Sequence, residues 1–272
     1  MARDNAEHCV LEARDVSRTY RPQKWSGRLK NHVVHALIDV NLAILSGSII
    51  GLVGESGSGK STLARCITGL ERPDSGEIWF EGRELFSVDA RELRRCRRKV
   101  QLVFQDPATA LNPLFTLEEI MTEPLLIAGL PRKQRREQAL AVMEQVGLPA
   151  RWSARRPDEL SGGQKQRLAI ARALAASPTV LVLDEALSGL DLPIQMQMTG
   201  LLFNLHQSLL LTYLFISHDL RLAAYFTHEI VVMKHGRIVE HANTPSLFAN
   251  PQHDHTRSLL AAVPKPPAEE SQ

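Results

Sequence analysis

The sequence lacks paired cysteines, long hydrophobic runs and an excess of charge of either sign. Its three cysteines, Cys9, Cys66 and Cys96, form no C-x-x-C pair and leave an odd count, which argues against a disulfide framework and a structural zinc site. The longest apolar stretch, residues 209–216, is far shorter than the roughly 20 residues that a membrane helix needs. With 32 basic and 30 acidic residues, the composition gives no support to nucleic acid as a partner.

The first residues also lack the apolar segment of a secretory signal, so we expect the protein to stay in the cytoplasm and to meet a membrane only through partners. The 272 residues, 44% of them hydrophobic, are enough for one large core. We expect an N-terminal tail over 1–10, a single domain over 11–263 and a disordered tail over 264–272 that is rich in proline and charge.

The order of predicted elements is that of an α/β fold. Short apolar runs alternate with turns over 11–53, and the apolar segment 49–53 is followed by a glycine-rich loop, a helix over 60–70 and a strand over 77–80. The character changes to helix over about 106–165, which indicates a helical subdomain inserted into the core. Continuous apolar runs at 179–183 and 213–216 are typical of a parallel sheet buried on both faces.

The glycine-rich loop carries a phosphate-binding motif. The pattern G-x-x-x-x-G-K-[ST] is matched by Gly54, Glu55, Ser56, Gly57, Ser58, Gly59, Lys60 and Ser61, and Thr62 continues the helix. Consecutive backbone N–H groups at a helix N-terminus bind phosphate oxygens, Lys60 would reach the β- and γ-phosphates, and Ser61 would ligate Mg²⁺. An ordinary glycine turn is the alternative, but it would not need the Lys-Ser pair.

The apolar strand over 180–183 delivers Asp184 and Glu185 at its C-terminal end, where α/β sheets place their ligands. Asp184 would hold Mg²⁺, while Glu185 could orient and polarise the water that attacks the γ-phosphate. Solvated acids at a strand end are the alternative interpretation. The phosphate loop earlier in the chain favours the catalytic one.

A third motif, Leu-Ser-Gly-Gly-Gln at 160–164, places Ser161, Gly162, Gly163 and Gln164 at the start of a helix-forming run. Between a phosphate loop and an Asp-Glu strand, this pentapeptide resembles the signature of ABC ATPases, and the resemblance covers about 11–245. It implies a P-loop NTPase core with a mixed sheet, an N-terminal antiparallel β part and an inserted helical signature subdomain. It also implies ATP and Mg²⁺ as cofactors, and a two-subunit ATPase in which each signature closes over the partner's ATP.

Further positions match that family in order. Tyr20 resembles the aromatic residue that stacks on adenine, and Gln105 resembles the Q-loop glutamine that touches both Mg²⁺ and the attacking water. Asp191 closes a segment that resembles the D-loop, and His218 resembles the switch histidine that contacts the γ-phosphate. The resemblance therefore implies Glu185, His218 and Gln105 as the catalytic residues. For Tyr20 an ordinary surface tyrosine, and for His218 a structural histidine, are the alternatives.

Two segments narrow the resemblance to the dipeptide, oligopeptide and nickel importer ATPases. Residues 106–113 resemble the segment after their Q-loop, and an extension over about 245–263 resembles their C-terminal element, with Asp254 and His255 replacing Pro and Tyr. The polar insert 21–31 resembles the second of the two ATPases in such importers. The resemblance implies a heterodimer with a second ATPase subunit, a homodimer remaining open, and two transmembrane permease subunits at the cytoplasmic face of the cell membrane. An extracytoplasmic receptor would be an indirect partner.

An ATPase of a non-transport complex, such as the one that cleaves carbon–phosphorus bonds, is the competing function. His253 and His255 could suggest a nickel site. Two histidines at i and i+2 without a third ligand are expected to be solvated instead.

Overall fold

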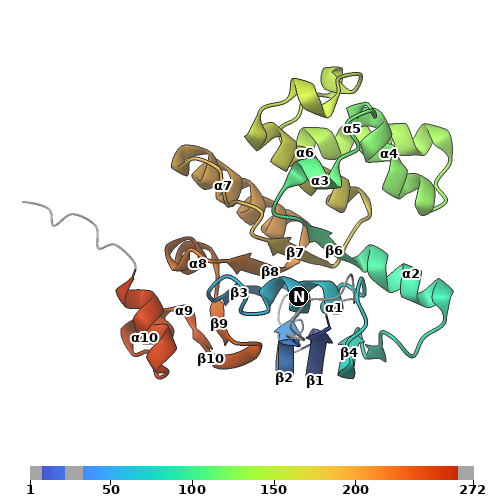
Figure 1. Ribbon diagram of the computed structural model, residues 1–272. Coiled ribbons are helices and arrows are strands. Elements are labelled where there is room, and N and C mark those ends of the chain that lie inside the picture. The colour runs from blue at the N-terminus through green and yellow to red at the C-terminus, as the bar shows by residue number, and fades with distance from the viewer. Residues whose placement is uncertain (1–7, 22–32, 263–272) are drawn as a thin grey trace, which may run out of the picture.

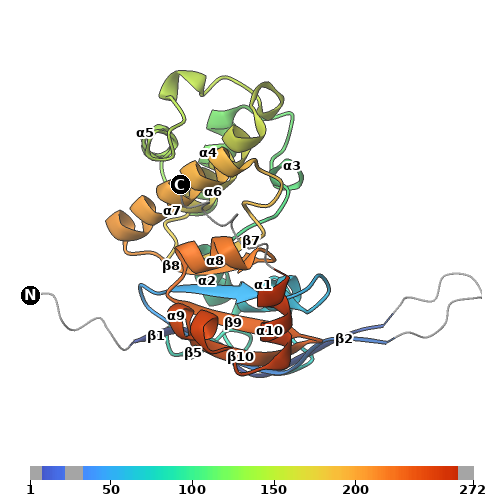
Figure 2. The same cartoon turned by 90° about the vertical axis from the view of Figure 1, so that its left-hand side faces the viewer.

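The computed structural model describes residues 8–21 and 33–262 (Figure 1). The predicted tail over 264–272 and nearly all of the insert 21–31 lie outside this range, as does most of the predicted tail over 1–10. Two sheets form the lower half of the molecule in Figure 1, and a lobe of helices stands above them. Figure 2 shows the same division from the side.

A four-stranded antiparallel sheet contains the N-terminal strands, in the order β2-β1-β4-β5. The chain enters it through two strands of 12 residues each, longer than the short apolar runs expected over 11–53. β1 begins at Cys9, and Val10 is buried, so these two residues belong to the strand and not to a tail. The bounds are β1 Cys9–Tyr20, β2 Val34–Leu45, β4 Ser75–Phe80 and β5 Arg83–Glu84.

The second sheet has the order β10-β9-β3-β8-β7-β6, and only its β9–β10 pair is antiparallel. Every residue of β3, β7 and β8 is buried, which confirms the sheet covered on both faces that the continuous apolar runs predicted. The bounds are β3 Ile49–Val53, β6 Val100–Val103, β7 Val180–Asp184, β8 Thr212–Ser217, β9 Glu229–Lys234 and β10 Arg237–Asn243.

Helices on the core follow these strands. Their bounds are α1 Lys60–Ile67, α2 Ala90–Lys99, α7 Leu192–Leu209 and α8 Leu220–Phe226. α1 is three residues shorter than the predicted 60–70. The Thr68 hydroxyl donates to the carbonyl of Ala64 (2.7 Å), and the N–H of Leu70 turns back to the carbonyl of Arg65 (2.9 Å), which is a typical helix ending.

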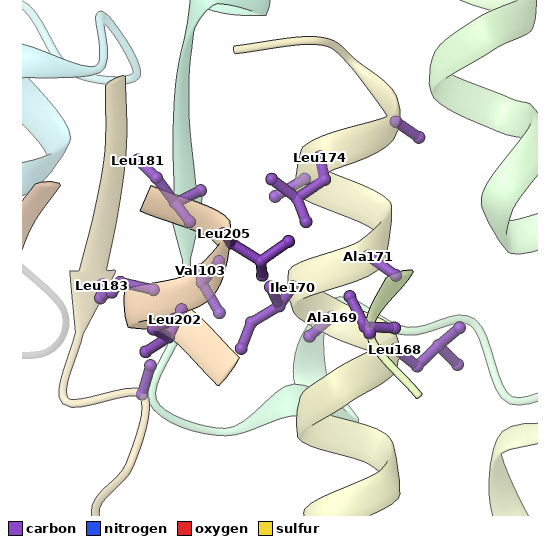
Figure 3. Packing of buried hydrophobic residues seen from close by; sticks show 14 of the residues in the cluster. Val103, Leu168, Ala169, Ile170, Ala171, Leu174, Leu181, Leu183, Leu202 and Leu205 are labelled. Atoms are coloured by element: carbon purple, nitrogen blue, oxygen red, sulfur yellow. The ribbon is translucent and has the colours of Figure 1, made fainter. Parts of the chain in front are cut away.

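The helical lobe confirms the inserted subdomain. Its elements are α3 Pro107–Ala110, α4 Leu117–Ile127, α5 Arg132–Gln145, the short 3₁₀ turns Ala150–Trp152 and Pro157–Glu159, and α6 Gly162–Ala175. α6 runs beyond the predicted boundary at 165 because its second half is apolar and packs on the core. Figure 3 shows Ile170 and Leu174 of α6 facing Leu205 of α7, and all three are buried. This contact ties the lobe to the sheet.

The C-terminal extension forms α9 Thr244–Ala249 and α10 Asp254–Ala261. Leu247 joins a buried cluster with Val53 at the end of β3, and Leu259 packs against the same cluster. The expectation that both histidines are solvated is wrong for His255, which is only 4% exposed, because α10 lies with this residue against the core. None of the described helices combines the length and the apolar character needed to cross a bilayer.

Candidate nucleotide-binding site

The loop between β3 and α1 is held from behind by backbone groups. The N–H of Gly236, at the turn between β9 and β10, donates to the carbonyl of Ser58 (2.9 Å). A Cβ at Gly54 would clash with the carbonyl oxygen of Met233, and a Cβ at Gly59, whose φ is +108°, would clash with that of Ala36. The loop therefore needs glycine at both ends, because the backbones of β2 and β9 approach it closely.

Lys60 lies over this loop and is only 4% exposed. Its ammonium donates to the carbonyl oxygens of Gly54 (2.8 Å) and Glu55 (2.9 Å). Burial lowers the pKa of Lys60, and the carboxylates of Glu185 and Asp184 oppose that shift. Since the first turn of α1 contains no acidic residue, the loop combines a buried cation with the positive end of a helix. This combination suits a phosphate chain.

Asp184 and Ser61 meet at the next position along the site. The Ser61 hydroxyl donates to Oδ1 of Asp184 (3.1 Å), and Asp184 is 8% exposed. Burial raises the pKa of the Asp184 carboxyl despite that hydrogen bond. No group of three or more His, Cys, Asp or Glu side chains suited to a metal occurs within residues 8–21 and 33–262. Mg²⁺ usually takes one or two protein oxygens and completes its shell with phosphates and water, so this pair of a half-buried hydroxyl and a buried carboxylate fits it.

Glu185 follows directly, in a left-handed backbone conformation with φ 48°. That conformation costs a residue with a Cβ about 1–2 kcal/mol, and the hydrogen bond from the Glu185 N–H to the carbonyl of Ile216 (3.0 Å) helps to hold it. Oε2 of Glu185 lies 3.3 Å from Nδ1 of His218, the residue after β8. The structure thus brings together two of the predicted catalytic side chains.

Gln105 is connected to Glu185 through a residue that was not predicted to be catalytic. Its amide donates to the hydroxyl of Ser188 (3.3 Å), and that hydroxyl donates to the carbonyl of Glu185 (2.7 Å). Ser188 is the first residue of the segment, ending at Asp191, that resembles the D-loop. Its position three residues after Glu185, in a turn, was the available signal, because serine hydroxyls often bond to a carbonyl of their own turn.

The signature residues form the capped start of α6. The Ser161 N–H donates to the side-chain oxygen of Gln164 (2.9 Å), and the Gln164 N–H returns a bond to the Ser161 hydroxyl (3.4 Å). Ser161 and Gly162 are exposed. These bonds stay within the turn and do not extend to the phosphate loop.

Asp191 lies next to the signature. It caps α7 by accepting from the N–H of Ile194 (3.0 Å), and a Cβ at Gly163 would come within 2.9 Å of Cγ2 of the same Ile194. The signature and the D-loop segment are therefore neighbours within one chain.

Tyr20 ends β1. Its hydroxyl donates to Glu71 (2.8 Å), just beyond α1, and the guanidinium of Arg18 lies 5.3 Å from its ring centre. The predicted adenine platform is thus tied to the far end of the helix that begins at the phosphate loop. A stacking role for this ring stays a prediction.

Comparison with known proteins decides the family. Residues 37–188 match the family model described as ABC transporter. The chain belongs to the ABC transporter ATP-binding family. This cassette is 41% identical over 257 residues to the dipeptide transport ATP-binding protein DppF of Escherichia coli, a match that covers 94% of the chain and 77% of the relative.

Solved structures agree with this assignment. The ATP-binding cassette MJ0796 in a post-hydrolysis state with ADP and phosphate has a TM-score of 0.75 and 32% identity, over 86% of this chain and 98% of that one. CbiO1 of Clostridium perfringens, part of the transporter complex cbiONQ, has a TM-score of 0.76 and 27% identity, over 90% and 92%. The ABC cassette described here binds ATP and is an ATPase.

Proposed function

We propose that this ABC cassette energises the import of peptides across a cell membrane, from a peripheral position on its cytoplasmic face. The observation that carries the proposal is the 41% identity to a dipeptide transport ATP-binding protein, which extends over 94% of the chain. Nickel is the other cargo that the sequence resemblance allows. In this assembly the cassette pairs with a second ATPase subunit, preferably a different one, and acts on two permease subunits.

The chain's own residues define the proposed hydrolysis. Lys60 and the N–H groups of residues 54–62 bind the phosphates, and Tyr20 stacks on the adenine. Ser61, Asp184 and Gln105 hold Mg²⁺, which when bound neutralises phosphate charge. Glu185 orients the attacking water and accepts its proton. His218, whose Nδ1 lies 3.3 Å from Oε2 of Glu185, orients that carboxylate and contacts the γ-phosphate.

The other half of the proposed site comes from the second subunit. Ser161, Gly162, Gly163 and Gln164 of one subunit would close on the ATP of its partner, and Asp191 would lie at the dimer contact. MJ0796, a bacterial ABC transporter cassette of similar fold, has a dimeric structure. Exposure of Ser161 and Gly162 at the start of α6 supports this arrangement, because a helix N-terminus with free N–H groups attracts phosphate.

A hollow of about 270 Å³ between α2, β6 and the helical lobe suits the permease contact. Its walls combine apolar side chains such as Leu102 and Ile127 with Arg94, Arg98 and Arg172. Nε of Arg98 is buried without a hydrogen-bond partner in the part of the chain that the structure describes. We therefore propose that the permease segment in this hollow has an apolar face and an acidic residue. Phe104, which also lines it, directly precedes Gln105, so movement there would reach the catalytic site.

Affinity purification of the chain from membranes in mild detergent, followed by mass spectrometry, tests the assembly. Two permeases and a sister ATPase are expected, together with a peptide receptor. Recovery of a nickel receptor in place of a peptide receptor would identify nickel as the cargo. Soluble enzymes without a membrane protein would contradict the import function and point to a catalytic complex such as the one that cleaves carbon–phosphorus bonds. Arg98→Glu should reduce recovery of the permeases while ATP binding by the purified chain stays unchanged.

A further inference from the structure

The C-terminal helix α10 lies against the phosphate loop, and His255 is its point of contact. The side chain is 3% exposed, and its Nδ1 lies 4.0 Å from Oε1 of Glu55, the second residue of the loop. This separation is longer than a hydrogen bond, so the two groups interact electrostatically across it. The other ring nitrogen, Nε2, is buried and has no hydrogen-bond partner among the residues that the structure describes.

The position of α10 is set independently of the phosphate loop. The Glu240 carboxylate on β10 accepts hydrogen bonds from the N–H groups of Gln252 (2.8 Å) and His253 (3.0 Å). Nδ1 of His253 then caps the helix by accepting from the N–H of His255 (3.0 Å). Because β10 fixes the start of the helix in this way, His255 is brought to Glu55 by a preformed support.

Glu55 links this support to the phosphate-binding lysine. Its carbonyl oxygen accepts from the N–H of Ser58 (3.1 Å) and from the ammonium of Lys60 (2.9 Å). Its side chain is 65% exposed, and His255 contacts it from the α10 side. A displacement of Glu55 would therefore move a direct anchor of Lys60.

We propose that His255 is a positioning residue for ATP binding, which from α10 holds Glu55 in place and through it the ammonium of Lys60. The C-terminal extension thereby becomes part of the nucleotide site's support. This inference rests on ATP binding at the loop and is independent of the cargo and of the permeases.

The variant His255→Gln tests the proposal, because it keeps a polar side chain but removes the imidazole. The Kd for ATP, measured by calorimetry on the full chain with Mg²⁺, is expected to rise about two- to tenfold, the lower part of the range of coupling between residues in contact. Hydrogen exchange of the amides over 54–62 should become faster. A merely structural role would accelerate exchange in α10 alone. The matched control is His241→Ala, an exposed histidine on β10 paired with Glu229, which should change neither measurement.

A double-mutant cycle with Glu55→Gln tests the route. If His255 acts through Glu55, His255→Gln should have a smaller effect on the Kd in the Glu55→Gln background than in the wild type. Equal effects in the two backgrounds, or an unchanged Kd and unchanged exchange over 54–62, would overturn the proposal. Should His255→Gln fold poorly, Glu55→Gln alone must still accelerate exchange over 54–62, or the proposal fails. A wild-type chain that binds no ATP would refute the function of the loop itself.

Discussion

Nδ1 of His218 lies 3.3 Å from Oε2 of Glu185, although 33 residues separate the two along the chain. β7 and β8 are parallel neighbours, and Asp184 pairs with Ile216, so the residues that follow the two strands meet at one edge of the sheet. His218 is 60% exposed at its side chain and Glu185 is 18% exposed. The pair therefore combines a shielded carboxylate with an imidazole that solvent can reach.

Glu185→Gln should leave ATP affinity unchanged and lower kcat by about 10²-fold or more, because the amide can still orient water but cannot accept its proton. The measurements are phosphate release and ATP calorimetry on the purified chain. Glu229→Gln is the matched control, since Glu229 lies 2.7 Å from His241 in a similar pair away from the site. Hydrolysis at the wild-type rate in Glu185→Gln would refute the assignment of this residue.

Ser188→Ala should lower kcat about five- to tenfold with little change in KM for ATP. The substitution removes the hydroxyl that bonds to the Glu185 carbonyl and accepts from Gln105, and one such bond contributes about 1 kcal/mol. Ser208→Ala on α7, whose hydroxyl bonds within its own helix, is the control and should behave like the wild type. An equal loss of kcat in both variants would show that the substitutions lower the stability of the fold, and would contradict a link between Gln105 and Glu185.

Much of the fold could be predicted because its core strands are short, apolar and bounded by turns. The β3 run 49–53 and the runs that became β7 and β8 are buried along their whole length, which leaves no competing pattern. β1 and β2 were predicted poorly. Their polar residues alternate with buried ones, and several register shifts between the two strands break that alternation.

The residues of the candidate site could be predicted from sequence motifs, whereas contacts between distant parts of the chain could not. Lys60, Ser61 and Asp184 were predicted by type and spacing. In the structure Asp184 accepts a hydrogen bond from Ser61 and interacts electrostatically with Lys60. The contact between His255 and Glu55 joins residues 200 positions apart and depends on how Glu240 holds the start of α10. No local pattern encodes such a contact. That is why burial of His255 was missed.

Acid should weaken the folded state through His255. Burial lowers the pKa of this imidazole below its usual 6.5, and the neighbouring positive charge of Lys234 adds to the shift, with smaller contributions from His253 and His235, while Glu55 opposes it. The unfolded chain therefore binds the proton more readily, so this contribution to stability is present above about pH 6.5 and is lost as the pH falls through the lowered pKa. Urea unfolding at a series of pH values should show a smaller loss on acidification for His255→Gln than for the wild type. Parallel curves would contradict this.

Asp184→Asn should stabilise the nucleotide-free chain while abolishing most ATP hydrolysis. Burial, with the nearby Glu185 carboxylate, raises the pKa of the Asp184 carboxyl above its usual 3.8, whereas the Ser61 hydroxyl and Lys60 act against the shift. The charged form is therefore disfavoured in the folded state, and its contribution to stability is lost as the pH rises through the raised pKa. An amide removes that charge and still accepts from Ser61. Thermal unfolding at pH 7.5 without nucleotide should give a higher Tm, by about 2–4 °C for each kcal/mol gained.

Asp39→Asn is the control, an exposed carboxylate paired with Arg237, and should leave Tm nearly unchanged. A lower Tm for Asp184→Asn would mean that the carboxylate contributes to the fold, and would contradict the view that its charge is retained there for function at a cost in stability.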